Sequence, residues 1–217
     1  MSHVPAGMTD TVKDKLINSA ISVFAEHGYR HGKVADIVKG ADANIAAVNY
    51  HFGSKENLFV HALRKAHRLA NAAHPTKGDL PDTASAEEKI KTIARGILRR
   101  SFDPGEAGDF NRIMSKTIHV PGSPIELILN EVRSMEHDYL EAVLAELLDT
   151  GFAPLVELAK LNFFALATII SKSPRGLKGL FAHEPTEDAI NELIEVQVSV
   201  VLTTIKSMAR HLEQTAT

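Results

Sequence analysis

The chain has 217 residues, of which 24 are Lys or Arg and 27 are Asp or Glu, so its formal net charge is −3. This balance excludes a uniformly basic protein that coats nucleic acid and an acidic disordered tail, and a hydrophobic share of 44% is enough to bury a core. The chain has no cysteine, which excludes disulfides, thiolate metal sites and a cysteine nucleophile.

Four helices are predicted in the first part of the chain. Apolar residues at helical spacing place the first over about residues 11–27, and Gly28 ends it. A second, short helix follows around residues 34–38. Asn44 is placed to cap a third helix, and Ser54 opens a longer fourth one. Residues 74–83 are rich in helix breakers and are predicted to be a connector.

The rest of the chain is also predicted to be helical. A capping box at residues 85–88 begins a helix that ends at residues 103–105, and another follows over about residues 106–118. A cap hydroxyl, a proline and a reciprocal glutamate at residues 123–126 begin a long helix that continues to about residue 148.

Two further helices are predicted, over about residues 155–173 and 190–212. In residues 195–200, apolar and polar residues alternate as they do in a strand. However, apolar residues at helical spacing continue on both sides of this segment over a length much greater than that of a strand, which favours a helix. The longest apolar run, residues 161–170, is shorter than the roughly 18 residues that span a bilayer, and the chain shows no signal-peptide pattern. We therefore expect an all-α, soluble cytoplasmic protein with no membrane partner.

Residues 33–52 predict a helix, a tight turn and a second helix, preceded by a longer bracing helix. This is the helix-turn-helix arrangement, which places its second helix in the major groove of DNA. Inside positions on that helix are predicted for Ala47, Val48 and Phe52. The outward candidates are Asn44, Ala46, Asn49, Tyr50 and His51. The alternative is that these outward residues form an ordinary solvated helix face.

The outward residues suit contacts with DNA. An asparagine can pair with the edge of adenine, and the small Ala46 lets the helix lie deep in the groove. Tyr50, His51 and Lys55 can reach phosphates, and Lys55 also lies in the first turn of a helix, where free N–H groups favour an anion. Residues 1–68 hold nine Lys or Arg and six Asp or Glu, so we expect this part alone to meet a polyanion.

The motifs of this region resemble those of TetR-family transcription regulators. Residues 48–59, Val-Asn-Tyr-His-Phe-Gly-Ser-Lys-Glu-Asn-Leu-Phe, are similar to the signature that joins the third and fourth helices of the family. Residues 43–47 resemble its turn and recognition-helix start, and residues 24–29 resemble the end of its first helix. The resemblance covers about residues 9–69. It implies a DNA-contacting set: Lys33, Asn44, Ala46, Asn49, Tyr50, His51 and Lys55.

Two positions depart from the family's pattern. The family usually has Thr or Ser at the start of the second helix, where this chain has Gly32 and Lys33, so we expect a weaker cap and a phosphate contact from Lys33. The family's turn usually carries glycine where Asp42 stands. Asp tolerates a left-handed backbone better than most residues, but it adds a negative charge near DNA.

The resemblance also implies how the chain is divided. A helix-turn-helix DNA-binding domain is expected over residues 9–69, with its motif at about 32–51, followed by a connector over 70–85. Residues 86–213 are expected to form a helical domain that binds a ligand and dimerises. Residues 113–125, followed by an acidic helix, resemble the C-terminal domain of the CecR-like branch of the family.

The helix at about residues 155–171 is apolar around its whole cylinder, so it must be covered on all sides. One face can meet its own domain and the other a partner chain, together with the last helix. A fully internal helix in a monomer is the alternative. The predicted dimer interface comprises Leu158, Phe163, Leu166, Ile170, Val198, Val201, Leu202, Ile205 and Met208.

A ligand cavity is predicted between helices of the C-terminal domain. Its expected lining is Phe110, Arg112, Met114, His119, Tyr139, Asn162 and Thr168. The alternative for each of these residues is an ordinary place in the core or on the surface.

The function that these features predict is a homodimeric DNA-binding regulator, a repressor that an unidentified small molecule releases from a palindromic operator on double-stranded DNA. An all-α dimeric regulator controlled by a protein partner, with no small-molecule pocket, is the alternative. We expect neither an enzyme nor a cofactor or metal site. The chain has no His-Glu-x-x-His motif, no Gly-x-Ser-x-Gly elbow and no phosphate-binding loop.

Overall fold

The computed structural model describes residues 11–117, 120–121, 125–132, 137–168 and 185–215. Throughout these ranges the secondary structure is helical, with turns between the helices and no strand. The all-α prediction is therefore confirmed. No helix in the described ranges combines the length and apolarity that crossing a bilayer requires.

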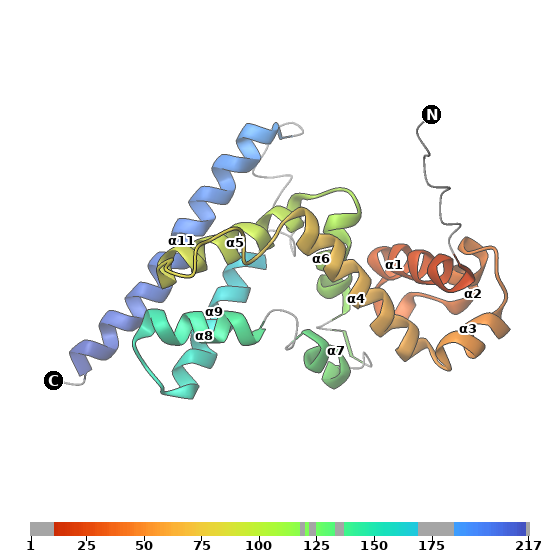
Figure 1. Ribbon diagram of the computed structural model, residues 1–217, viewed down its shortest axis with the longest axis horizontal. Helices are drawn as coiled ribbons and strands as arrows, with labels where there is room; N and C mark the ends of the chain where they lie inside the picture. Colours follow the sequence, from red (N-terminus) through yellow and green to blue (C-terminus); the bar gives the residue numbers. More distant parts are fainter. Residues whose placement is uncertain (1–10, 118–119, 122–124, 133–136, 169–184, 216–217) are drawn as a thin grey trace, which may run out of the picture.

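The helices form two parts (Figure 1). The N-terminal part consists of α1 (Val12–His31), α2 (Val34–Gly40), α3 (Ile45–Phe52) and α4 (Lys55–Ala73). The remainder, which we call the body, consists of α5 (Ala86–Phe102), the short 3-10 helix η1 (Glu106–Gly108), α6 (Asp109–Thr117), α7 (Ile125–Val132), α8 (Asp138–Leu148), α9 (Ala153–Thr168) and α11 (Glu187–Thr215). Figure 1 shows α3 at one end of the molecule and α11 at the other.

Several helices begin where the sequence predicts because side chains cap them. Oδ1 of Asn44 accepts a hydrogen bond from the N–H of Ala47 at 3.0 Å, and Ser54 caps α4 in the same way. Ser85 and Glu88 form the predicted capping box of α5. Such caps satisfy N–H groups that have no partner within the helix, and so fix its first residue.

Two predicted helices have different bounds in the structure. α1 continues to His31, but Gly28 within it is not helical, with φ of 70°, so the predicted stop is a kink. Instead of one helix over residues 123–148 there are two elements: α7 packs on α4, whereas α8 packs on α5 and α9. The cap predicted at Ser123 lies outside the described residues. α11 is helical across residues 195–200, as the length of its apolar stripe predicts.

Two buried clusters hold the molecule together. The first cluster contains residues of α1, α2, α3 and α4, including the fully buried Leu16, Phe24 and Phe59. The second contains residues of α5, α8, α9 and α11. Phe110 and Ile113 of α6 belong to the first cluster. α6 therefore packs with the N-terminal helices, although the expected domain boundary at residue 86 assigns it to the C-terminal domain.

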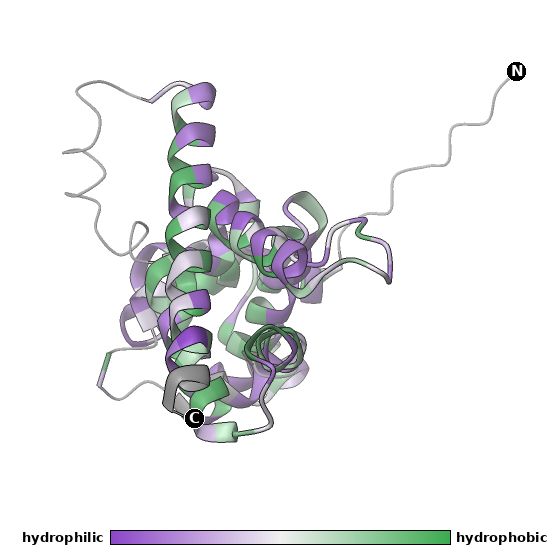
Figure 2. Cartoon of the chain, turned by 90° about the vertical axis from the view of Figure 1, so that its left-hand side faces the viewer, coloured by the Kyte–Doolittle hydropathy of each residue, from purple (hydrophilic) through white to green (hydrophobic). Residues whose placement is uncertain are grey.

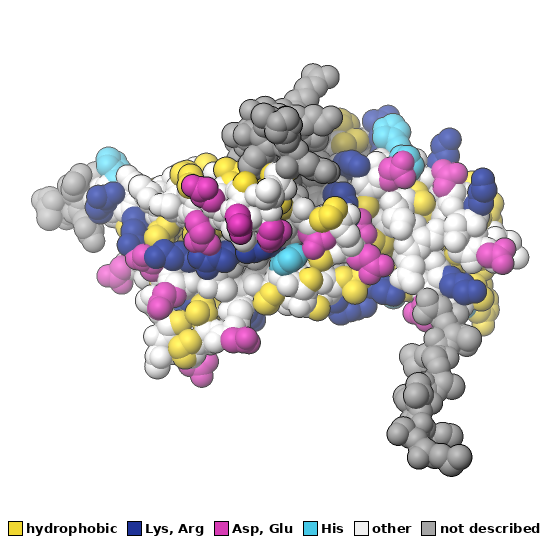
Figure 3. All heavy atoms as spheres, turned by 90° about the horizontal axis from the view of Figure 1, so that it is seen from above, with side chains coloured by type: hydrophobic (Ala, Val, Ile, Leu, Met, Phe, Trp, Pro, Cys, Tyr) yellow, Lys and Arg dark blue, Asp and Glu magenta, His cyan; other side chains and the backbone are white. Residues whose placement is uncertain are grey.

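Ion pairs connect α5 to α11 on the surface of the body. Arg95 makes two hydrogen bonds to the carboxylate of Glu195, at 2.6 and 2.8 Å, and Arg99 pairs with Glu187 at 2.8 Å. Figure 3 shows basic and acidic side chains gathered next to one another on one face of the molecule. Exposed pairs of this kind contribute on the order of 1 kcal/mol or less each, so burial of the second cluster remains the main stabilisation.

Candidate functional site

α2 and α3 are joined by a tight turn with a defined hydrogen-bond pattern. The N–H of Ala43 donates to the carbonyl of Val38 at 2.9 Å, and the N–H of Asp42 donates to the carbonyl of Lys39 at 3.3 Å. These are the two bonds of a Schellman motif, which needs a left-handed residue. Asp42 is that residue, with φ of 49°. Lys33 precedes α2 without a side-chain cap, as the sequence predicts.

α3 has one buried and one exposed face. Val48 and Phe52 are 2% and 5% exposed and pack into the first cluster. The opposite face is open to solvent and consists of Asn44, Ile45, Ala46, Asn49 and Tyr50. Among the other predicted contact residues, Lys33 is exposed and His51 and Lys55 are half-buried. α3 and the first turn of α4 lie at the end of the molecule away from α11 (Figure 1).

The two asparagines of this face differ in what they can still bind. Oδ1 of Asn44 accepts the N–H of Ala47, so one of its two lone pairs and the orientation of the side chain are committed to the cap of α3. A bidentate contact with adenine needs both a donor and an acceptor in one plane. The side chain of Asn49 makes no hydrogen bond within the described residues, so it keeps both groups available.

A small network lies at the beginning of α4. The hydroxyl of Tyr29 donates to Oε1 of Glu56 at 2.5 Å, and Nζ of Lys55 lies 4.5 Å from the centre of the Tyr29 ring. This hydrogen bond lowers the pKa of Glu56, and burial lowers the pKa of Lys55 although the charge of Glu56 opposes that shift. Lys55 is therefore positioned by a cation–π contact rather than free in solvent.

α6 makes hydrogen bonds to the residues of α1 next to the kink at Gly28. Nζ of Lys116 donates to two carbonyls of α1 just before Gly28, each at 2.8 Å. Oγ1 of the buried Thr117 accepts the N–H of Tyr29 at 3.3 Å. Tyr29 thus links α6 to the first turn of α4. Sequence analysis missed Lys116 and Thr117, because nothing local to residues 109–117 indicates that they meet α1.

The residues predicted to line a ligand cavity do not form one lining. Phe110 and Met114 pack on the first cluster, and Arg112 donates to the carbonyls of Asp103 and Gly105, which fixes the turn before α6. The remaining described residues of the set lie on α8 and α9 of the body: Tyr139, Asn162 and Thr168. His119 lies outside the described residues. The described residues of the predicted lining are therefore divided between two parts of the molecule, because α6 turns its apolar face to the N-terminal helices.

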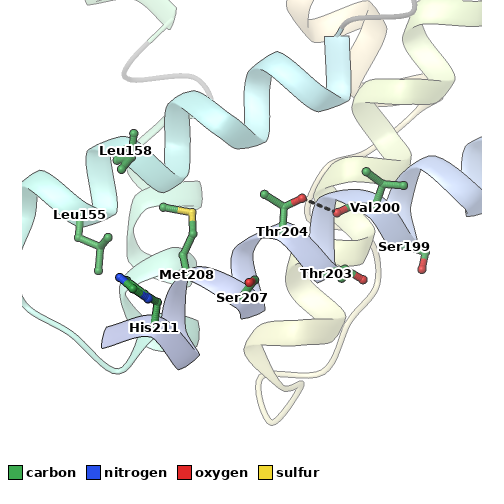
Figure 4. Close-up of a pocket in the computed structure, with 9 residues that line it drawn as sticks. All are labelled: Leu155, Leu158, Ser199, Val200, Thr203, Thr204, Ser207, Met208 and His211. Atoms are coloured by element: carbon green, nitrogen blue, oxygen red, sulfur yellow. Dashed lines mark hydrogen bonds between the residues drawn. The ribbon is translucent and has the colours of Figure 1, made fainter. Parts of the chain in front are cut away.

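Some of the predicted dimer residues are buried within the chain, and others are exposed. Five of them are buried within the chain itself: Phe163, Val198, Val201, Leu202 and Ile205. Buried side chains have no surface to offer a second chain, so the prediction is wrong for these five. Leu158 is 50% exposed, and together with Met208 it lines an open groove of about 760 Å³ between α9 and α11 (Figure 4). Leu166 is half-buried against the second cluster, and Ile170 lies outside the described residues.

The outer sides of α9 and α11 carry exposed apolar residues that sequence analysis missed. Leu161 is 60% exposed, Val196 56% and Val200 42%. Figure 2, which faces α11, shows that apolar residues recur along this helix between polar ones. Large apolar residues grouped on one face mark an interaction surface. We call this surface, formed by Leu158, Leu161, Val196 and Val200, the outer apolar face.

The turn, the exposed face of α3 and the bracing α1 define the chain as a helix-turn-helix protein with a helical body. Residues 16–62 match the family model described as bacterial regulatory proteins, tetR family. The N-terminal helices are therefore similar to the DNA-binding part of TetR-family regulators, as the motifs of this region predict.

Relatives of known class share part of the chain. The HTH-type transcriptional repressor NicS of Pseudomonas putida is 32% identical over 88 residues, which are 40% of this chain and 42% of NicS. The HTH-type transcriptional dual regulator CecR of Shigella flexneri is 27% identical over 152 residues, 63% of this chain and 64% of CecR. The matched part thus spans less than two thirds of either relative. Both relatives are regulators of transcription.

A solved structure extends the likeness to the body. The transcriptional regulator FadR from Bacillus subtilis, determined in complex with stearoyl-CoA, superimposes with a TM-score of 0.63 at 16% identity, over 87% of this chain and 96% of FadR. At this identity the likeness shows a common fold.

Proposed function

We propose that the protein is a homodimeric DNA-binding regulator of transcription, a repressor that a small molecule releases from a palindromic operator. The observation that carries this proposal is the exposed face of α3, where Asn49 and Tyr50 stand on a helix whose other face is anchored in the first cluster. In a dimer, two such helices would enter successive major grooves about 34–36 Å apart.

The outer apolar face supports the homodimeric part of the proposal. It lies on α9 and α11, at the end of the chain away from α3, so a second copy can cover it while both α3 helices stay accessible (Figure 1). Covering it removes apolar surface from water, which stabilises an association in proportion to the area buried. A two-fold axis would place the same residues of each copy opposite one another.

The ligand-responsive part of the proposal rests on the contacts between α6 and the N-terminal helices. Lys116 and Thr117 hold α1 next to Tyr29, which in turn touches the first turn of α4. A displacement of α6 in the body would therefore reach the phosphate-binding end of α4. For the ligand to release DNA, it must bind the DNA-incompetent form more tightly than the competent one.

Stearoyl-CoA is the first effector to test, because the FadR structure contains it. A ligand that binds the folded state raises the melting temperature, and one present at 100 times its Kd stabilises by about 2.7 kcal/mol. A stabilising acyl-CoA that also releases bound DNA would support control by a small molecule. If neither acyl-CoA nor a wider metabolite collection shifts the melting temperature, control by a protein partner becomes the better account.

Selection of bound sequences from random duplex DNA, at two salt concentrations, tests the central proposal. A recovered palindrome with two half-sites is the expected result. Binding that is sensitive to salt but indifferent to sequence would contradict it, because contacts with phosphates alone give that behaviour.

Two substitutions on the DNA-facing side should have different effects. Asn49→Ala should weaken binding to the selected operator by about tenfold or more and relax the preference at one base pair, because it removes both groups of a bidentate contact. Lys55→Ala should weaken binding to all sequences about equally and reduce the slope of log Kd against log salt by about one. Titrations over a range of salt concentrations measure both. Operator binding unchanged in both variants would remove these residues from the DNA-binding surface.

Asp42→Asn should strengthen DNA binding about three- to tenfold at low salt, because it removes a negative charge from the turn beside α3. Asparagine keeps the left-handed backbone that Asp42 adopts, so the turn itself should persist. Asp79→Asn, which removes the same charge from an exposed residue of the connector, is the matched control. Equal effects of the two substitutions on DNA affinity would show that the charge at residue 42 has no local role.

A further inference from the structure

Ile45, the first residue of α3, is an exposed apolar side chain in a place where the fold gives it no packing role. It is 55% exposed, whereas Val48 and Phe52 of the same helix are almost fully buried. The cap by Asn44 fixes the beginning of α3, so the position of Ile45 on the helix is defined. An isoleucine that contributes little to the core of its own chain has surface free for a partner.

Ile45 occupies the position on α3 that faces base edges in helix-turn-helix proteins bound to DNA. The N-terminal residues of a recognition helix contact the bases, and side chains of a helix tilt toward its N-terminus. Ile45 and Asn49 are four residues apart and share one face, at about 6 Å along the helix axis. Stacked base pairs are about 3.4 Å apart, so these two side chains would meet base pairs one or two steps apart.

We propose that Ile45 determines operator specificity by packing against the 5-methyl group of a thymine in each half-site. This inference rests on the function proposed above and specifies which base the site takes. In the major groove only thymine presents a methyl group, next to its O4 acceptor. Guanine, adenine and cytosine present polar edges there instead.

The chemistry of an isoleucine explains why thymine would be preferred. Ile45 has no hydrogen-bonding side-chain group, so packing it against O6 and N7 of guanine or the amino group of cytosine would remove those groups from water without replacing their hydrogen bonds. Packing against a methyl group removes apolar surface from water on both sides. The side chain therefore favours thymine by attraction and disfavours the other bases by the cost of desolvation.

The test replaces single thymidines of the selected operator by 2′-deoxyuridine, which removes the methyl group and nothing else. For the unaltered protein we expect one position in each half-site where uracil weakens binding about fourfold, as for one buried methyl group. For Ile45→Ala, the thymine and uracil operators should bind equally at that position. Ile45→Val should keep most of the uracil effect, because it retains a branched apolar side chain.

Asn49→Ala is the control for the methyl measurement. It should weaken the operator overall but preserve the uracil effect at the position assigned to Ile45, because the two side chains meet different base pairs. Thermal unfolding of Ile45→Ala checks that the fold is retained, and little change is expected since the residue is largely exposed.

The outcomes separate this inference from the proposed function. If selection recovers no sequence preference, the proposed function fails and the inference fails with it. If an operator is recovered but uracil has the same effect on the unaltered protein and on Ile45→Ala at every thymine, the function stands and the assignment of Ile45 is overturned.

Discussion

Replacing Gly28 with alanine should lower the free energy of unfolding by about 3–5 kcal/mol. Gly28 has φ of 70° and ψ of 176°, a region of backbone space that is open essentially to glycine alone. In addition, a Cβ at this position would lie 2.6 Å from the carbonyl oxygen of Lys116 in α6. Because that obstacle is backbone, α1 and α6 would have to separate, which would also strain the Lys116 and Thr117 contacts.

Gly53→Ala is the matched control for the contact between α1 and α6. Gly53 also has a positive φ, of 75°, but a Cβ there would meet nothing within 4 Å. Both substitutions place a Cβ on a backbone with positive φ, although ψ differs, 176° at Gly28 and −35° at Gly53. The excess loss in Gly28→Ala is expected at about 1–3 kcal/mol and reports mainly the contact with α6. Urea titrations give both free energies of unfolding. Equal losses would show that α6 is not held tightly against the kink.

The helix-turn-helix could be predicted from sequence because its determinants are local. Asn44 and Ser54 cap the helices that follow them, and Asp42 supplies the left-handed residue of the turn. Each of these contacts joins residues a few positions apart, so the pattern of residue types is sufficient. The inward Val48 and Phe52 were assigned correctly for the same reason, since one buried face fixes the other.

The body could be predicted only as a set of helices. α9 is apolar on all sides, so its sequence does not distinguish the face that meets α11 from the face that stays exposed. The prediction therefore selected Phe163 on the inner face and omitted Leu161 on the outer one. The packing of α6 depends on contacts between residues about ninety positions apart in sequence, such as Thr117 with Tyr29. A local sequence pattern cannot predict such contacts.

The exposed isoleucine at the beginning of α3 shows a signal that sequence analysis overlooked. The predicted contacts with DNA are mainly polar residues and do not include Ile45, although this residue follows the cap directly. An apolar residue at an outward position of a recognition helix is informative, because the same face presents Asn49 for hydrogen bonding. A binding face that combines the two chemistries can distinguish bases by shape as well as by hydrogen bonds.

Leu158→Glu should convert the protein to a monomer and weaken operator binding by roughly 100-fold or more, because a monomer loses the second half-site that a linked partner binds at high effective concentration. Leu158 is 50% exposed in the single chain, so the charge should not disturb the second cluster. In the dimer, the same charge would be buried against an apolar surface without a partner, which is strongly unfavourable. Light scattering after size-exclusion chromatography and operator titration measure the two effects.

Two further variants make this result specific to the outer apolar face. Val200→Glu, on α11 across the groove, should also give a monomer, because both residues line the same surface (Figure 4). Val12→Glu places the same charge on an equally exposed apolar residue of α1, 49% exposed, and should leave the dimer intact. Dimers in both Leu158→Glu and Val200→Glu would exclude the outer apolar face as the dimer contact. Monomers in those two alone would place the two-fold axis between the α9 and α11 helices of the two copies, at the end of the molecule opposite α3.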